Sequence, residues 1–181
     1  MKEHILTALY LSLPLVLSGI LHMAVVKFDL LSALKKPLSA PLFGANKTLR
    51  GLILFPILTV GTTWLVAFFE PRESSLLLVR LRDGSPTVLG FALGLAYVLA
   101  ELPNSYIKRR LAVKPGMLPD RNRLVFAMFD QADSAFGCAI AYLLLRPVPT
   151  WTLVCIVLLG PTVHLVVNVS LYCVGLRERP I

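Results

Sequence analysis

Five long runs of apolar residues, separated by polar loops, dominate the pattern of the chain. Each run is close to the roughly 20 residues that an α-helix needs to cross the hydrocarbon core of a bilayer. The first run is longer than the apolar part of a signal peptide, about 7–15 residues, so we expect it to be kept as a span. The predicted spans are Ile5–Val26, Leu52–Phe69, Thr87–Leu102, Leu124–Leu145 and Trp151–Gly175.

The composition supports membrane insertion. Of the 181 residues, 56% are hydrophobic and 15% are charged, whereas soluble domains average about 45–50% and about 25%. This disfavours a soluble enzyme, a disordered chain and a nucleic-acid-binding module. We therefore predict an all-α integral membrane protein in which residues 1–181 form one membrane-embedded domain.

The positive charges are unevenly distributed between the two sides of the predicted spans. The net charge is +8, and most of the 18 Lys and Arg residues fall in the loops 27–50 and 103–123 or after residue 175. Cytoplasmic loops of membrane proteins are enriched in Lys and Arg. Five spans then place the N-terminus outside and the C-terminus in the cytoplasm, in the inner (cytoplasmic) membrane.

Two acids lie inside the fourth apolar run. Asp130 and Asp133 are three residues apart, which places both carboxylates on one face of a helix. Two unpaired anions so close would repel one another, and a divalent cation would remove this repulsion. Pairing with Lys or Arg from a neighbouring helix, or a proton relay, is the alternative interpretation. We expect the pair to face the cytoplasm.

The third run ends in a polar stripe. Glu101, Asn104, Ser105 and Lys108 follow the spacing i, i+3, i+4, i+7, so a helix would bring them to one face. The basic cluster that begins at Lys108 has an alternative interpretation as a membrane anchor. The histidines His4, His22 and His164 have no evident carboxylate partner, and we interpret them as structural.

A basic loop precedes the second run. It contains Asn46, Lys47, Thr48 and Arg50, whose side chains offer hydrogen-bond donors. A helix that begins near Thr48 would also direct free N–H groups and a positive dipole end toward an anion. The spacing is not that of a Walker A loop. The two acids, the polar stripe and the basic loop are all expected at one membrane surface. A metal-bound polyphosphate and an anionic lipid headgroup would together provide binding partners for all three.

These segments resemble a known enzyme family. The order and spacing of residues 46–51, 105–116 and 130–133 are similar to those of the CDP-archaeol synthase family, a branch of the membrane CTP:phosphatidate cytidylyltransferase group. The resemblance implies transfer of a cytidylyl group from CTP to a membrane lipid phosphate, giving a CDP-lipid and pyrophosphate. It implies Mg²⁺ as cofactor, with Mn²⁺ as the alternative.

The resemblance also assigns roles by position. Asp130 and Asp133 would hold the metal, with Glu101 as a further ligand where the family pattern carries Asp. The catalytic set is Asp130, Asp133 and Lys108. The residues expected to bind the nucleotide or the lipid phosphate, or to line their site, are Asn46, Lys47, Thr48, Arg50, Asn104, Ser105, Arg109 and Arg110.

Several alternatives stay open at this point. Membrane-buried acids are also typical of transporters, although no inverted repeat is visible. A CDP-alcohol phosphotransferase would need an Asp-Gly-x-x-Ala-Arg motif, which Asp83-Gly84 does not continue. Departures from the family pattern at Glu101, Ala132 and Ser134 leave the lipid class open and keep an inactive assembly partner as a third alternative. We expect CTP, a lipid phosphate and the bilayer as partners, no nucleic acid, and allow for a homodimer.

Overall fold

The computed structural model describes residues 1–71, 76–119 and 122–177. It confirms an all-helical protein with five helices that are long and apolar enough to span a membrane. Within the described residues there is no strand, and a single isolated bridge joins Pro37 to Thr48. The long helices are α1 (Lys2–Lys27), α3 (Leu49–Phe68), α4 (Pro86–Arg110), α5 (Arg123–Leu145) and α6 (Thr150–Cys173), and η1 (Ser32–Leu34) and α2 (Ala40–Phe43) are short.

The helices begin where the sequence supplies caps. Thr48 Oγ1 accepts a hydrogen bond from the Gly51 N–H (3.4 Å) at the start of α3, as the predicted helix start near Thr48 requires. Ser85 Oγ accepts one from the Val88 N–H (3.3 Å) at the start of α4. Such side chains satisfy N–H groups that the first helical turn leaves free.

The helix α4 is longer than the sequence predicted. The predicted span ended at Leu102, but α4 continues through Pro103 to Arg110. The polar stripe of Glu101, Asn104 and Lys108 is therefore helical. This extension carries the stripe to one end of the bundle.

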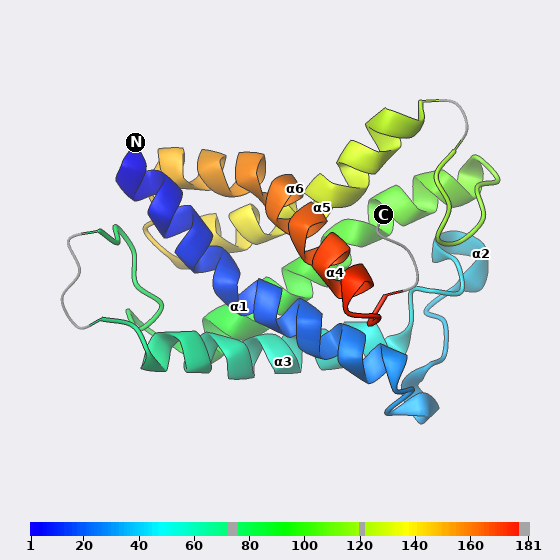
Figure 1. The fold of residues 1–181 in the computed structure, drawn as a ribbon, viewed down its shortest axis with the longest axis horizontal. Helices are drawn as coiled ribbons and strands as arrows, with labels where there is room; N and C mark the ends of the chain where they lie inside the picture. Colours follow the sequence, from blue (N-terminus) through cyan, green and yellow to red (C-terminus); the bar gives the residue numbers. More distant parts are fainter. Residues whose placement is uncertain (72–75, 120–121, 178–181) are drawn as a thin grey trace.

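Figure 1 shows how the connections divide between two ends of the bundle. The N-terminus and the α3–α4 and α5–α6 connections lie at one end. The connection from α1 through η1 and α2 to α3, the α4–α5 connection and the end of α6 lie at the other. This matches the division of loops expected from the charge pattern, although Arg72, Arg121 and Arg179 lie outside the described residues.

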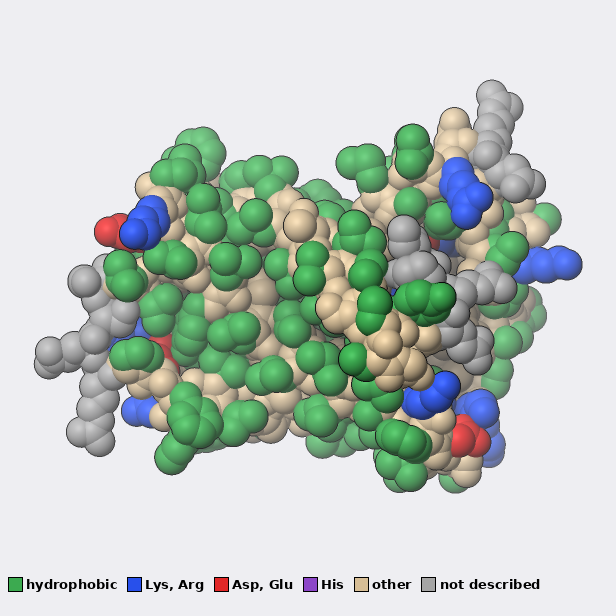
Figure 2. Space-filling view, viewed as in Figure 1, with side chains coloured by type: hydrophobic (Ala, Val, Ile, Leu, Met, Phe, Trp, Pro, Cys, Tyr) green, Lys and Arg blue, Asp and Glu red, His purple; other side chains and the backbone are tan. Residues whose placement is uncertain are grey.

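The helices pack closely through small residues. A Cβ at Gly94 of α4 would lie 2.5 Å from Pro56 Cα in α3, and one at Gly137 of α5 would lie 2.6 Å from the Ala96 carbonyl oxygen in α4. Small residues of this kind let membrane helices approach each other closely. Apolar side chains cover most of the face shown in Figure 2, and the charged side chains gather toward its two ends. This distribution fits a bundle whose sides face lipid.

Candidate active site

A cavity of about 1070 Å³ lies among the five long helices. One part of its wall is polar and comes from the charged end of α4, the start of α5 and the α2–α3 connection. Another part is apolar and comes from α1 and α6, including Leu15, Val16, Ile156 and Val163. The cavity therefore joins charged groups to a hydrocarbon-like wall.

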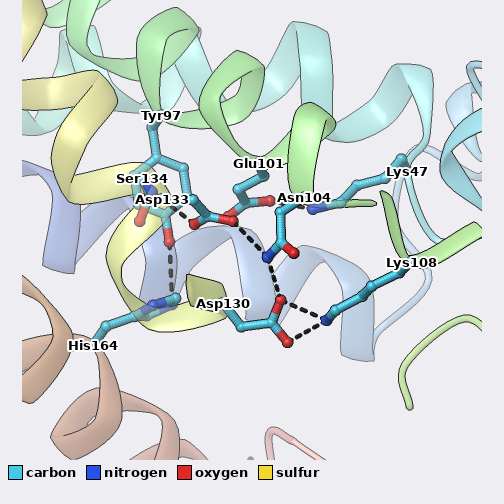
Figure 3. Close-up of polar contacts among 9 residues, drawn as sticks. All are labelled: Lys47, Tyr97, Glu101, Asn104, Lys108, Asp130, Asp133, Ser134 and His164. Atoms are coloured by element: carbon cyan, nitrogen blue, oxygen red, sulfur yellow. Dashed lines mark hydrogen bonds and ion pairs between the residues drawn. The ribbon is translucent and has the colours of Figure 1, made fainter. Parts of the chain in front are cut away.

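The two aspartates of α5 lie on the polar wall, on one face of the helix as predicted (Figure 3). Asn104 Nδ2 donates to Asp130 Oδ1 (2.5 Å) and to Asp133 Oδ2 (3.2 Å), and so joins the two carboxylates. The Ser134 N–H donates to Asp133 Oδ1 (2.7 Å). Lys108 donates to both carboxylate oxygens of Asp130, at 2.5 Å for Oδ1.

The three sequence segments meet at this wall. Lys47, from the connection before α3, forms an ion pair with Glu101 of α4, and both side chains are largely buried. On one face of α4, Glu101 contacts the α2–α3 connection, whereas Asn104 and Lys108 contact α5 (Figure 3). The alternative interpretation, in which the two aspartates pair with basic residues of a neighbouring helix, holds for Asp130, which pairs with Lys108 of α4. Asp133 forms no ion pair within the described residues.

The electrostatics of Lys47 follow from this burial. Desolvation alone would lower the pKa of its ammonium group, but the negative charge of Glu101 and its hydrogen bond outweigh it. Asp133 and Asp130 act in the same direction, so the net pKa of Lys47 is raised. Lys47 therefore stays protonated, and its ion pair with Glu101 holds the α2–α3 connection against α4.

Comparison with known proteins identifies the family of this chain. The profile of the CarS-like family, described as CDP-archaeol synthase, matches residues 1–181. The chain belongs to this family. The CDP-archaeol synthase of Thermofilum pendens (strain DSM 2475 / Hrk 5) is 31% identical over 140 residues, which are 77% of this chain and 59% of the relative. The chain thus matches about three-fifths of that relative's length. No solved structure matches it.

The sequence resemblance predicted a divalent metal, and the donor set can be tested for it. In the described part of the chain, no group of three or more Asp, Glu, His or Cys residues could hold a metal ion by itself. Magnesium, however, needs only one or two carboxylates when waters and substrate phosphates supply its other ligands. Asp130 and Asp133 provide such a pair, so the residues fit Mg²⁺ that arrives with a polyphosphate. Glu101 is held by Lys47, and its ligation stays a prediction.

The structure separates the remaining predicted binding residues into three groups. Ser105, Arg109 and Asn46 line the cavity. Arg50 also lines it, but its side chain is 5% exposed and donates to Asp29 Oδ1 (3.2 Å) and to the Leu30 carbonyl (3.0 Å), so it also fixes the chain after α1. Thr48 lines the cavity as well and caps α3. Arg110 forms the third group: it does not line the cavity, and its exposed guanidinium lies 4.9 Å from the centre of the Tyr106 ring.

The sequence reasoning missed an aromatic group in the cavity wall. Tyr97 stacks on Phe55 with ring centroids 4.5 Å apart, and its hydroxyl lies 3.2 Å from His164 Nε2. His22 contacts the edge of Phe55 at 5.7 Å between ring centroids. Tyr97 lies four residues before Glu101, on the same helical face, and this spacing is the signal that could have indicated it.

Proposed function

We propose that this member of the CDP-archaeol synthase family transfers a cytidylyl group from CTP to a membrane lipid phosphate. The observation that carries the proposal is the cavity itself. It places a pair of carboxylates and several cations beside a wall of apolar side chains from α1 and α6. Such a site suits a reaction between a water-soluble polyphosphate and the headgroup of a lipid.

The reaction needs positioning more than a side-chain nucleophile. An oxygen of the lipid phosphate attacks the α-phosphorus of CTP, the bond from that phosphorus to the β-phosphate oxygen breaks, and pyrophosphate leaves. A phosphate is already ionised at neutral pH, so no side chain has to remove a proton. The protein instead orients the two phosphates in line and offsets their charge.

The residues of the polar wall suit these tasks. Asp130 and Asp133 would hold Mg²⁺, with Mn²⁺ as the alternative, and the metal when bound would neutralise charge on the triphosphate. Lys108 and Arg109 carry positive charge along the same end of α4 and would bind phosphate oxygens. Asn104 holds the two carboxylates at a fixed separation through its amide. Lys47 would bring the basic loop to the nucleotide.

The apolar part of the cavity would receive the start of the lipid chains. We further propose that the charged end of the bundle faces the cytoplasm, where CTP is found, because the connections at that end carry most of the Lys and Arg residues. A variant with Lys114→Cys and Cys173→Ser tests this orientation. A membrane-impermeant maleimide should label it in inverted vesicles and leave it unlabelled in right-side-out vesicles, and the opposite result would reverse the topology.

Release of pyrophosphate by the purified protein in detergent tests the reaction. The assay contains CTP and Mg²⁺ with phosphatidic acid, with an archaeal ether-lipid phosphate, or without lipid. Lipid-dependent release is expected, and the better lipid identifies the substrate class. Asp133→Asn, which keeps the size of the side chain and removes its charge, should abolish it. Folded protein that neither binds CTP nor releases pyrophosphate would refute the proposal and favour a carrier or an inactive assembly partner.

A further inference from the structure

The segment that follows α6 turns back into the cavity. Gly175 has φ +74°, a left-handed conformation that glycine adopts at little cost. The N–H groups of Leu176 and Arg177 both donate to the Leu171 carbonyl, at 2.9 and 3.2 Å. This turn ends the helix and directs Leu176 and Arg177 to the cavity wall.

The charges that line the cavity are unbalanced. Among the described residues, seven cationic side chains and three carboxylates line the cavity: Lys27, Lys35, Lys47, Arg50, Lys108, Arg109 and Arg177, and Glu101, Asp130 and Asp133. Four of the cations form ion pairs, with Glu101, Asp130 or the nearby Asp29. Within the described residues, Lys27, Arg109 and Arg177 form none. Cationic groups held at a cavity wall without a carboxylate favour an anionic ligand.

Arg177 differs from the other two in where it comes from. The cavity is lined by both α4 and α6, which meet through the contact between the Tyr97 hydroxyl and His164 Nε2. Lys108 and Arg109 belong to α4, whereas Arg177 follows α6. Arg177 lines the same cavity as Glu101 and Asp133 of the polar wall. Burial lowers the pKa of its guanidinium, and the negative charge of Glu101 opposes this effect.

We propose that Arg177, which follows α6, binds a phosphate group of a substrate in the cavity that the cations of α4 also line. A guanidinium offers two parallel N–H groups that match a phosphate, and it stays charged when partly buried. The phosphate belongs either to CTP or to the lipid. The inference rests on the proposed cytidylyl transfer, and the test distinguishes the two sources.

The test compares Arg177→Gln and Arg177→Lys with a matched control. Arg123→Gln removes the same charge from an exposed position at the start of α5, outside the residues that line the cavity. Arg177→Gln should raise KM about tenfold for one substrate, CTP or lipid phosphate, and that substrate identifies the phosphate. Arg177→Lys, which keeps the charge without the paired N–H groups, should raise it about threefold, and the control should keep the wild-type values.

The proposal is overturned if Arg177→Gln keeps the wild-type KM for both substrates, or changes it no more than Arg123→Gln does. If the wild-type protein releases no pyrophosphate, the proposed function fails separately. The phosphate site is then tested by titration calorimetry with inorganic pyrophosphate in detergent. Binding about tenfold weaker in Arg177→Gln than in wild type and in Arg123→Gln would support the site, and equal binding would overturn it.

Discussion

The ion pair between Lys108 and Asp130 permits a test in which a second substitution should restore stability but not activity. The Lys108 side chain is 10% exposed and that of Asp130 is 30% exposed. Removing one partner of a fully buried ion pair costs about 3–5 kcal/mol, because a charge is left without compensation. Since solvent reaches part of Asp130, about half of this, ~2 kcal/mol, is a reasonable expectation for Lys108→Met.

A loss of ~2 kcal/mol corresponds to a melting temperature lower by about 4–8 °C in a protein of this length. The double variant Lys108→Met/Asp130→Asn leaves no unpaired charge at this position. It should therefore recover most of the lost stability, although Asp130→Asn alone, which strands the buried ammonium group, should be destabilised. Activity should not recover, because the proposed metal ligand and the proposed phosphate ligand are both absent.

Thermal unfolding in detergent, followed by tryptophan fluorescence, measures the four proteins of this cycle, and pyrophosphate release measures their activity. If the double variant loses as much stability as the two single variants together, the pair contributes no net coupling energy. If the double variant also keeps lipid-dependent activity, Lys108 and Asp130 do not act in the reaction.

The remaining predictions concern packing, charge and pH. Gly94→Ala should lower the stability by about 1–3 kcal/mol in thermal unfolding, because its Cβ would lie 2.5 Å from the backbone of α3. Gly61→Ala is the matched control, with no atom within 4 Å of its Cβ, and should not destabilise. Arg109→Gln should lower kcat/KM about tenfold or more, as expected for a charged hydrogen bond to phosphate, and Arg110→Gln, outside the cavity, by less; equal losses would contradict the assignment. Lys47→Met should lower the melting temperature at neutral pH. Because the pKa of Lys47 is raised in the folded protein, the difference from wild type should persist up to about pH 10.5, the ordinary value, and be lost only above it.

The five spans could be predicted because the bilayer sets both their length and their composition. The structure moves most of their ends by three residues or fewer, and the exception is informative. The predicted span Thr87–Leu102 ended before Pro103, where the apolar run gives way to polar and basic residues. In the structure α4 continues to Arg110. Lys108 is 8% exposed and pairs with Asp130, so a contact between two helices, absent from local sequence, accounts for a basic residue in this buried position.

Part of the site could be predicted because the spacing of residues along a helix determines which of them share a face. The spacing of Asp130 and Asp133 determines their shared helical face, and the i, i+3, i+7 stripe includes Lys108 but leaves Arg110 off it. The structure agrees with the stripe, since Arg110 lies outside the cavity and against Tyr106. Pairings such as Lys47 with Glu101 join positions 54 apart, and no local pattern specifies which lysine meets which acid. Arg177 could not be predicted, because its position at the cavity wall depends on the turn after α6.

The ion pairs explain how a site of this kind can stay charged inside a membrane protein. Without substrate, Lys108 and Lys47 compensate Asp130 and Glu101, so the folded protein does not bear the cost of isolated buried charges. In the proposed reaction, a metal-bound polyphosphate would offer phosphate oxygens to the lysines, and its metal would pair with the carboxylates. Binding would then exchange one set of ion pairs for another, without moving uncompensated charge into the bundle. Asp133 forms no ion pair within the described residues, so its charge should matter most for metal binding.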